Sequence, residues 1–365
     1  VKRKILFILN SYNFMSKKLS NKFSLKKNFD YFNKKDKSWV NIFYNSLKKD
    51  YILHKNYPNL SKILLGEKQY LEVLNKKIED FKPDLIFVSI DSDKIHKIVK
   101  KYKNIKKIIW ISHKVNSQKI FDLKNSYNYL ITDNDFLISE SKKIKFKFFK
   151  MLISSPSILN LNLNFKNFKK RSDKLYFSGS LGNDFKKRLN YLIYLSENFQ
   201  IKLRIRNLVE KFKILNYLNS FFLKLIPNTA NFLYKRKILP LTNKLKYINN
   251  DEIFGKDMLD ELKNYKFCIN IHSDFDQDNS INSRVFEALS CGCLLFTDEN
   301  KAMKRIFKKN KHVIYFKSKS DLRDKIIYYK KNIGISYKIA KESNDFFIKN
   351  HQSKARIKQF KKILK

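Results

Sequence analysis

The stretch that decides the fold begins at Phe267-Cys-Ile-Asn-Ile-His-Ser273 and resumes, after a polar connection, as Ser280-Ile-Asn-Ser-Arg-Val-Phe-Glu-Ala-Leu-Ser-Cys-Gly-Cys-Leu-Leu-Phe-Thr-Asp298. Its first apolar run predicts a buried strand. Ser280 or Asn282 can then cap a helix, and Gly292 predicts the end of that helix. A second apolar run follows at once. Strand, loop, helix and strand in this order indicate a parallel sheet covered by helices.

The same alternation continues on both sides of this stretch. Upstream, strands are predicted at 4–9, 84–90, 107–112, 127–132 and, more weakly, 148–153, with a helix at 67–81. A linker is predicted at 154–172. The pattern then restarts with a strand at 174–178, a turn at 179–182, a helix at 184–197 and a strand at 201–205, and it ends with a strand at 311–316 and helices from 320 onward. The predicted fold class is α/β, with two Rossmann-like domains whose parallel sheets face each other across a cleft.

Residues 208–245 depart from this alternation of predicted strands and helices. They interleave bulky apolar residues with Lys and Arg and contain a single acid, Glu210. A basic amphipathic helix pair of this kind can lie on an anionic membrane surface. The alternative is a helical hairpin that is inserted into the second domain and packs against it.

The composition is strongly basic. The chain has 365 residues, 78 Lys and Arg against 33 Asp and Glu, and a formal net charge of +45. A nucleic-acid-binding protein concentrates its charge on one face or tail, whereas the lysines here are spread along the whole sequence. We therefore expect a solvated basic surface and no specific nucleic-acid partner. The field still favours anions such as nucleotide phosphates, acidic glycans and anionic lipids.

The cysteines and the apolar runs bear on the compartment. Cys268, Cys291 and Cys293 include one Cys-x-Cys pair without a second pair to complete a zinc site, so we expect buried, reduced thiols. No apolar run approaches the roughly 18–20 residues of a membrane span. Residues 1–9 are interpreted as a first strand. These features predict a cytoplasmic protein, with peripheral contact at the inner face of the membrane through 208–245 as an option.

The helix after Asn282 has the features of a phosphate site. In an open parallel sheet, ligands bind beyond the carboxyl ends of the strands, where a helix N-terminus offers free N–H groups to an anion. Arg284, in the first turn, adds a guanidinium suited to diphosphate. Glu287 shares its face and can accept both hydroxyls of a ribose. The alternative is a surface ion pair beside ordinary core residues.

The run 282–298 resembles the donor-site signature R-x-F-E-A-x-x-x-G of spore-maturation CgeB-like glycosyltransferases, relatives of family 4 of the GT-B-fold sugar transferases. The likeness covers most of 174–365, including Tyr176-Phe-Ser-Gly-Ser180, Arg188, and the register of His351 and Arg356. It implies the GT-B fold, with an acceptor-side domain at 1–170 and a nucleotide-sugar-binding domain at 171–345. It also implies a C-terminal helix at 346–365 that packs back on the first domain.

The resemblance implies transfer of a sugar from a nucleotide-diphosphate sugar to a glycan, lipid-linked or protein acceptor, without a metal or other cofactor. Glu287 would hold the donor ribose, and Arg284 and the amides near Ser280 and Asn282 would face the diphosphate. Further donor-binding residues implied are Asn279, His272, Asn270, Gly179, Ser180 and Arg188. Asn279 stands where many relatives carry a second glutamate, and an amide can still bind sugar hydroxyls.

One histidine of the first domain is a candidate for proton transfer. His113 follows the strand at 107–112, in a region from which similar enzymes direct a histidine toward the donor sugar or the leaving phosphate, and its side chain could act as acid or base. The alternative is a loop histidine that is satisfied locally. A second hypothesis for the whole chain is a noncatalytic GT-B-derived module that binds an acidic polymer or a membrane surface.

Two acidic motifs resemble metal sites. Asp91-Ser92-Asp93 follows the strand at 84–90 and has the D-x-D pattern, but this pattern often occurs by chance, and a solvated loop or helix cap is the favoured interpretation. The motif at Asp274, Asp276 and Asp278 lacks the glycine and glutamate of a calcium loop. No metal site is predicted.

Overall fold

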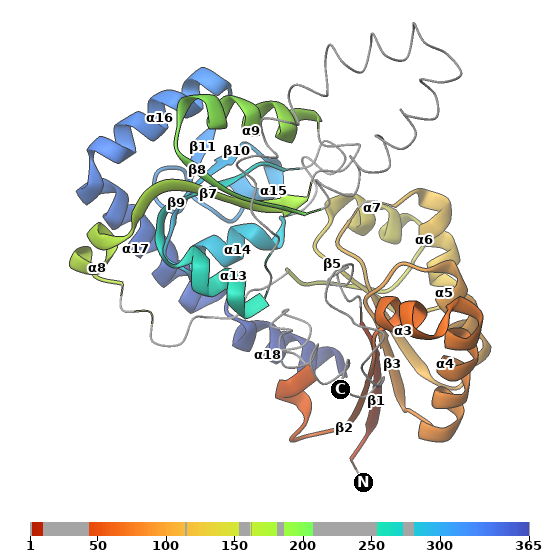
Figure 1. The fold of residues 1–365 in the computed structure, drawn as a ribbon. Helices are drawn as coiled ribbons and strands as arrows, with labels where there is room; N and C mark the ends of the chain where they lie inside the picture. Colours follow the sequence, from red (N-terminus) through yellow and green to blue (C-terminus); the bar gives the residue numbers. More distant parts are fainter. Residues whose placement is uncertain are drawn as a thin grey trace, which may run out of the picture.

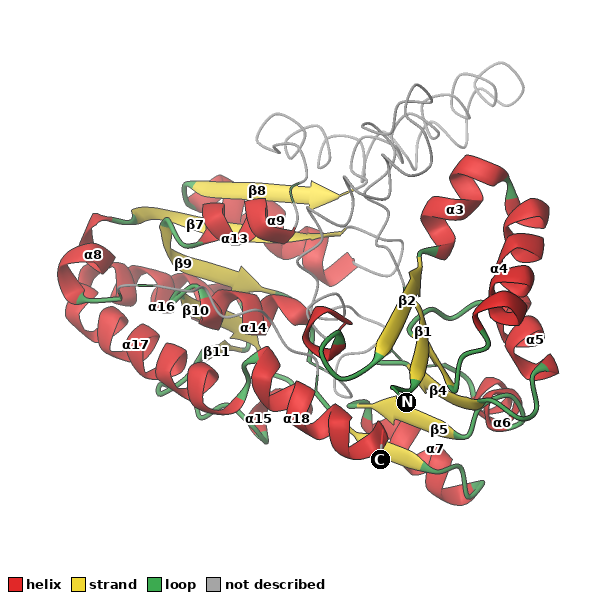
Figure 2. Ribbon diagram, turned by 90° about the horizontal axis from the view of Figure 1, so that it is seen from below, coloured by secondary structure: helices red, strands yellow, loops and turns green. Residues whose placement is uncertain are grey.

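The computed structural model describes residues 2–9, 44–113, 115–152, 161, 163–180, 186–206, 253, 255–272 and 281–364. They form two lobes, each a parallel sheet with helices on both faces (Figures 1 and 2). The strand order is β2-β1-β3-β4-β5-β6 in the first sheet and β11-β10-β9-β7-β8 in the second. This confirms the predicted fold class of two α/β domains.

The described part of the first domain consists of strands and helices that mostly alternate along the chain. Its elements are β1 (Lys4–Ile8), β2 (Ile52–Asn56), α3 (Pro58–Leu65), α4 (Glu67–Phe81), β3 (Leu85–Val88), α5 (Asp93–Lys101), β4 (Lys106–Trp110), α6 (Ser117–Lys124), β5 (Tyr129–Thr132), α7 (Asp135–Lys143) and β6 (Phe148–Lys150). The central strand β3 is buried throughout, which is why it was recognisable as an apolar run. Strand β2 was not predicted, because this edge strand alternates exposed and partly buried residues and contains His54 and Lys55.

The second domain follows the same plan. Its elements are α8 (Phe165–Lys170), β7 (Ser172–Ser180), α9 (Lys186–Asn198), β8 (Ile201–Arg206), α13 (Gly255–Leu262), β9 (Tyr265–Asn270), α14 (Ser283–Ser290), β10 (Leu294–Asp298), α15 (Lys301–Lys304), β11 (Ile314–Phe316), α16 (Lys319–Lys331), α17 (Ile333–Asn350) and α18 (Ser353–Leu364).

Two local predictions in this half were wrong. The segment expected to be a linker contains helix α8, which forms because Asn164 caps it by accepting from the amide of Asn167 and because Phe168 is fully buried. The turn expected at Gly179 and Ser180 does not begin there, since both residues still pair with strand β8. Strand β7 is therefore longer than its apolar core.

Gly292 ends α14, as predicted, for two physical reasons. Its φ is +65°, in the left-handed region that favours glycine. A Cβ atom at this position would also lie 2.5 Å from a methyl carbon of Leu163. The glycine therefore permits both the reversal of the chain and the close approach of the segment before α8.

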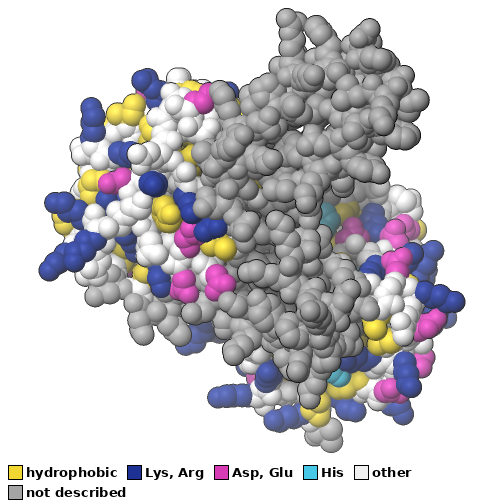
Figure 3. Space-filling view, in the orientation of Figure 1, with side chains coloured by type: hydrophobic (Ala, Val, Ile, Leu, Met, Phe, Trp, Pro, Cys, Tyr) yellow, Lys and Arg dark blue, Asp and Glu magenta, His cyan; other side chains and the backbone are white. Residues whose placement is uncertain are grey.

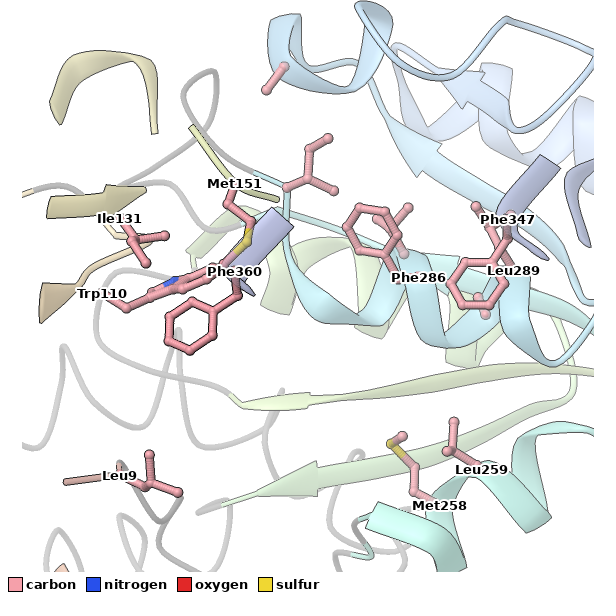
Figure 4. Close-up of a cluster of buried hydrophobic side chains, with 14 of the residues drawn as sticks. Leu9, Trp110, Ile131, Met151, Met258, Leu259, Phe286, Leu289, Phe347 and Phe360 are labelled. Atoms are coloured by element: carbon pink, nitrogen blue, oxygen red, sulfur yellow. The ribbon is translucent and has the colours of Figure 1, made fainter. Parts of the chain in front are cut away.

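The two domains share one apolar core, part of which is shown in Figure 4. Phe360 of helix α18 is fully buried and its ring centroid lies 5.3 Å from that of Phe87 on β3. Arg3 of the first domain donates to the carbonyl of Leu364 at 3.1 Å. Helix α18 thus packs against the first sheet, and apolar contact as well as chain connectivity holds the lobes together.

Polar contacts also join the two domains. Arg305, at the end of α15, forms a forked ion pair with Asp135 at the start of α7. Arg356 on α18 is buried and donates to the carbonyl of Leu152 at 3.1 Å. These contacts restrain how far the second domain can turn relative to the first.

The state of the cysteines, the spread of basic residues and the hydropathy of the helices can each be compared with the sequence-based expectations. The three cysteines are buried and form no disulfide, which agrees with the predicted buried, reduced thiols, and burial raises the pKa of Cys293 to about 12. In Figure 3, Lys and Arg are scattered over both lobes instead of gathering in one patch. Among the described helices, none combines the length and the hydropathy needed to span a bilayer.

Candidate functional site

The candidate site lies where α14 begins. The strands of the second sheet run toward the other lobe (Figures 1 and 2), so their carboxyl ends and the start of α14 are found on the side of the first domain. Val285, Phe286, Ala288 and Leu289 of α14 are buried. Burying this face leaves Arg284 and Glu287 on the side of the helix that is only partly covered.

Arg284 and Glu287 form an ion pair across one turn of α14, through Nη1 and Oε2. Nη1 of Arg284 also lies 2.8 Å from the sulfur of Met258 on α13. The Arg284 side chain is 34% exposed and the Glu287 side chain is 17% exposed. The pair is therefore held in place yet accessible to a ligand, as a site for a ribose and a diphosphate requires.

Helix α13, which carries Met258, is itself anchored to the sheet. Arg204 on β8 binds both carboxylate oxygens of Glu261 at 2.9 Å, and the hydroxyl of Tyr176 on β7 lies 3.4 Å from the same carboxylate. Such a bidentate pair fixes geometry as well as charge. It holds α13 against the start of α14.

A chain of side-chain hydrogen bonds crosses the carboxyl ends of β9 and β10. Asn282, just before α14, donates from Nδ2 to Oδ1 of Asn270 at 2.8 Å. Asn270 donates in turn to the hydroxyl of Thr297 at 3.0 Å, and its Nδ2 lies 3.5 Å from Nδ1 of His272. Asn282 makes no capping bond with its side chain. Its side chain instead ties the start of α14 to the end of β9.

Asp298, the last residue of β10, receives three partners. Its Oδ1 lies 2.7 Å from Nδ1 of His272 and accepts the backbone N–H of the same residue at 3.0 Å. Its Oδ2 pairs with Nζ of Lys187, on α9, at 2.8 Å. Burial alone would raise the pKa of Asp298, but the hydrogen bond from His272 and the charges of His272 and Lys187 outweigh it and lower the pKa to about 2.

This lowered pKa predicts an acid-dependent loss of stability. A carboxyl group whose pKa falls from 3.8 to about 2 on folding stabilises the fold fully above its unfolded value and progressively less as the pH drops through 4 toward 2. Nearly two units correspond to about 2 kcal/mol. Urea unfolding between pH 6 and pH 3 should show part of this loss in the wild type and none of it in Asp298→Asn.

Asp321→Asn is the matched control for that experiment, because Asp321 also pairs with a lysine, Lys325, at 2.6 Å but is partly exposed at the start of α16. An equal pH dependence in the wild type and in Asp298→Asn would show that the buried carboxylate is not held as described.

Arg188 is engaged with the backbone. Its Nε and Nη2 donate to the carbonyl of Ile271 at 3.0 and 2.6 Å, and its Nη1 donates to the carbonyl of Ser180 at 2.7 Å. The side chain is buried. Arg188 therefore clips the end of β7 to the end of β9, and its role as a phosphate ligand stays a prediction.

Gly179 and Ser180 end β7 beside this clip. A Cβ atom on Gly179 would lie 3.0 Å from the ring of Phe177, so a larger residue would push that ring aside. Both residues are half-buried at the carboxyl edge of the sheet. Asn279, Ser280, the acidic motif at 274–278 and the basic segment 208–245 lie outside the described residues.

His113 lies at the carboxyl end of the first sheet, after β4. Its side chain is 54% exposed, and Nε2 is 3.7 Å from Oδ2 of Asp91. Asp91 also binds Nε2 of His96 at 3.1 Å and Nζ of Lys119 at 2.9 Å. Burial would raise the pKa of Asp91, but hydrogen bonds from His113, His96 and Lys119 hold it well below its usual range.

The D-x-D motif does not present an open cation site. Asp91, Asp93 and His96 bring three ligand atoms within 4.8 Å of one another, which is close enough for a metal. However, the ammonium group of Lys119 pairs with both carboxylates and supplies the positive charge there. Asp93 begins α5, so a helix start accounts for this part of the motif.

Sequence reasoning missed Asp298, Thr297 and Lys187 as members of the site. Asp298 and Thr297 were recognisable only as the end of an apolar run. A polar residue at the carboxyl end of a buried parallel strand is the signal that could have singled them out. Lys187 carried no such signal, because its partner lies 111 residues away.

The sequence and the fold are similar to those of known proteins. Residues 230–362 match the model of a family described as glycosyl transferase-like. A search of the curated proteins found no match. Among solved structures, the sucrose-phosphate synthase of Thermosynechococcus elongatus is similar with a TM-score of 0.61 and 8% identity, over 100% of this chain and 98% of that one.

Two further structures are similar over almost their whole length. HepE from Anabaena, solved in complex with UDP and glucose, has a TM-score of 0.60 and 10% identity and covers 99% of both chains. A glycosyltransferase from Rickettsia africae has a TM-score of 0.55 and 12% identity, over 99% of this chain and 97% of that one. These structures show that the chain has the GT-B fold, and residues 230–362 carry the match to the glycosyl transferase-like family.

Proposed function

We propose that this protein transfers a sugar from a nucleotide-diphosphate sugar to an acceptor and binds that donor at the start of α14. The observation that carries the proposal is the partly accessible Arg284–Glu287 ion pair at the start of a helix beside the carboxyl ends of parallel strands. The complexes of HepE with UDP and with UDP-glucose support a nucleotide sugar as the donor.

In the proposed complex, Glu287 accepts the hydroxyls of the ribose, and Arg284 and the first N–H groups of α14 bind the diphosphate. Asn279 and Ser280 precede that helix in the sequence and are proposed to bind the same donor. Asn270 and His272 lie toward the sugar. Gly179, Ser180 and Arg188 are proposed to border the donor at the end of β7. Arg188 contributes there by holding the backbone carbonyls of Ser180 and Ile271. The donor-site signature favours the CgeB-like subtype.

The reaction breaks the bond between the anomeric carbon and the diphosphate oxygen and forms a bond from that carbon to an acceptor oxygen. Arg284 and the helix start stabilise the charge that develops on the leaving diphosphate, so a metal is not required. His113, on the opposite domain, is the proposed group that exchanges the acceptor proton.

The acceptor is proposed to be a glycan, a lipid-linked sugar or a protein of the cell envelope, bound on the side of the first domain. The basic segment 208–245 would then bring the protein to the inner face of the membrane. Both proposals follow from the net charge of +45, because a basic surface concentrates acidic glycans and anionic lipids.

A thermal-shift screen tests the proposed function. The wild type should be stabilised by one or more of UDP, GDP, ADP, CDP and dTDP, because a ligand that binds only the folded state at a hundred times its Kd adds about 2.7 kcal/mol. Inorganic phosphate at the same concentration is the control. A screen in which no nucleotide shifts the transition would contradict the proposal.

The second candidate function is a noncatalytic GT-B-derived module that binds an acidic polymer or a membrane. The net charge and Asn279, in place of a second glutamate, favour it. Binding to anionic vesicles that weakens steeply with salt, without stabilisation by any nucleotide, would support this function over the first.

A further inference from the structure

Two buried side-chain atoms between the carboxyl end of β9 and the start of α14 have no hydrogen-bond partner among the described residues. They are Nε2 of His272 and Oδ1 of Asn282. His272 as a whole is only 4% exposed. Leaving a buried polar atom unsatisfied costs about 1–3 kcal/mol, and few such atoms persist without a ligand or a water. The pair therefore indicates a bound group that the described residues do not supply.

Asp298 determines which nitrogen of His272 is available. Its Oδ1 lies 2.7 Å from Nδ1, and a carboxylate can only accept, so Nδ1 carries the proton. The backbone N–H of His272 donates to the same oxygen at 3.0 Å, and Lys187 holds the other oxygen. The ring cannot turn over without breaking this arrangement. Nε2 is consequently the atom that remains for a ligand.

The hydrogen bonds of Asn270 determine the orientation of Asn282. Nδ2 of Asn270 is used by the hydroxyl of Thr297, which leaves Oδ1 of Asn270 as the acceptor for Nδ2 of Asn282. This orientation makes Oδ1 of Asn282 the outstanding atom, and a carbonyl oxygen can only accept. The network thus presents Oδ1 of Asn282, which must accept a hydrogen bond, and Nε2 of His272, which accepts one whenever the imidazole is neutral.

Hydroxyl groups satisfy both atoms, whereas phosphate oxygens do not. One hydroxyl can donate to Oδ1 of Asn282, and a second can donate to Nε2 of His272 or accept from Nε2 if the ring is protonated. An ionised phosphate has no proton to donate and would place oxygen against oxygen at Asn282. The ligand must therefore present hydroxyl groups, as a sugar does.

The place of Asn282 before α14 indicates whether these hydroxyl groups belong to the ribose or to the transferred sugar. In the proposed function, Glu287 holds the ribose and Arg284 the diphosphate, and Asn282 lies before both on the chain. We infer that His272 and Asn282 bind hydroxyl groups of the transferred sugar, with Asp298 and Lys187 as positioning residues that aim the imidazole. This inference rests on the proposed function and adds the residues that recognise the sugar.

Calorimetric titration tests this inference by comparing the affinity for a nucleotide diphosphate with that for the corresponding nucleotide sugar. The ligands are UDP and UDP-glucose, or the nucleotide that stabilises the wild type most and its glucose conjugate. In His272→Ala and in Asn282→Ala, the Kd of the nucleotide diphosphate should stay within about twofold, while that of the nucleotide sugar should rise about tenfold for one lost hydrogen bond and its unpaired partner. Asp298→Asn should raise the Kd of the nucleotide sugar by less than His272→Ala does, because the imidazole remains and Nε2 can bond a hydroxyl group in either tautomer.

His54→Asn is the control, since His54 lies on β2 of the other domain. If His272→Ala does not fold, Asn282→Ala carries the test, because Asn282 is only partly buried and makes no capping bond. Unchanged sugar affinity in these variants would mean that a buried water alone satisfies the two atoms and would overturn the inference, as would an equal loss of both ligands. A wild type that binds neither ligand would refute the proposed function first and this inference with it.

Discussion

Glu287→Ala is expected to lower affinity for the nucleotide-diphosphate donor by about a hundredfold or more, since two hydrogen bonds to a charged group contribute about 1.5–3 kcal/mol each. The carboxylate lies on α14 in an ion pair with Arg284 and is the only group of that pair able to accept from a ribose. Removing it also breaks the ion pair with Arg284. Calorimetry with the nucleotide identified by thermal shift measures the loss.

Glu342→Ala is the matched control for Glu287→Ala. Glu342 also pairs with a cation, Lys311, at 2.8 Å, on a partly exposed part of the same domain. It should leave nucleotide affinity unchanged. Undiminished binding in Glu287→Ala would remove the basis for placing the ribose at α14.

Phe360→Ala is expected to destabilise the protein by about 3–5 kcal/mol, the usual cost of emptying a large aromatic site in a packed core. The Phe360 ring is fully buried and packs against Phe87 and Phe7 of the first sheet although it belongs to the last helix of the chain. The truncation therefore weakens the contact that joins the two domains. Chemical unfolding followed by circular dichroism measures the change.

Ile348→Ala controls for the loss of apolar surface near the C-terminus. Ile348 lies on α17 and is 46% exposed, so its truncation should change stability by no more than about 0.5 kcal/mol. If Phe360→Ala were equally mild, α18 would not be packed on the first domain as the structure has it.

The parts of the fold that were predictable share one property, a local pattern. Strand β3 and helix α4 are visible in sequence because a buried parallel strand is continuously apolar and an amphipathic helix repeats at three or four residues. Gly292 marked the end of α14 because its conformation needs glycine. Strand β2 and helix α8 were missed because an edge strand and a short basic helix carry no such pattern.

The candidate site was predictable only in part. Arg284 and Glu287 lie one turn apart on one helix, so their meeting follows from helical periodicity. The bond between His272 and Asp298 joins residues 26 positions apart, and that between Arg188 and Ile271 joins residues 83 apart. Such contacts depend on which strands become neighbours. Sequence periodicity does not contain that information.

The most direct test of the central claim is a crystal structure of the wild type with the nucleotide diphosphate that stabilises it most. The account predicts density at the start of α14, with ribose hydroxyls within hydrogen-bonding distance of the Glu287 carboxylate and a phosphate beside Arg284. Density for the nucleotide at any other place in the molecule, with these two side chains untouched, would contradict it.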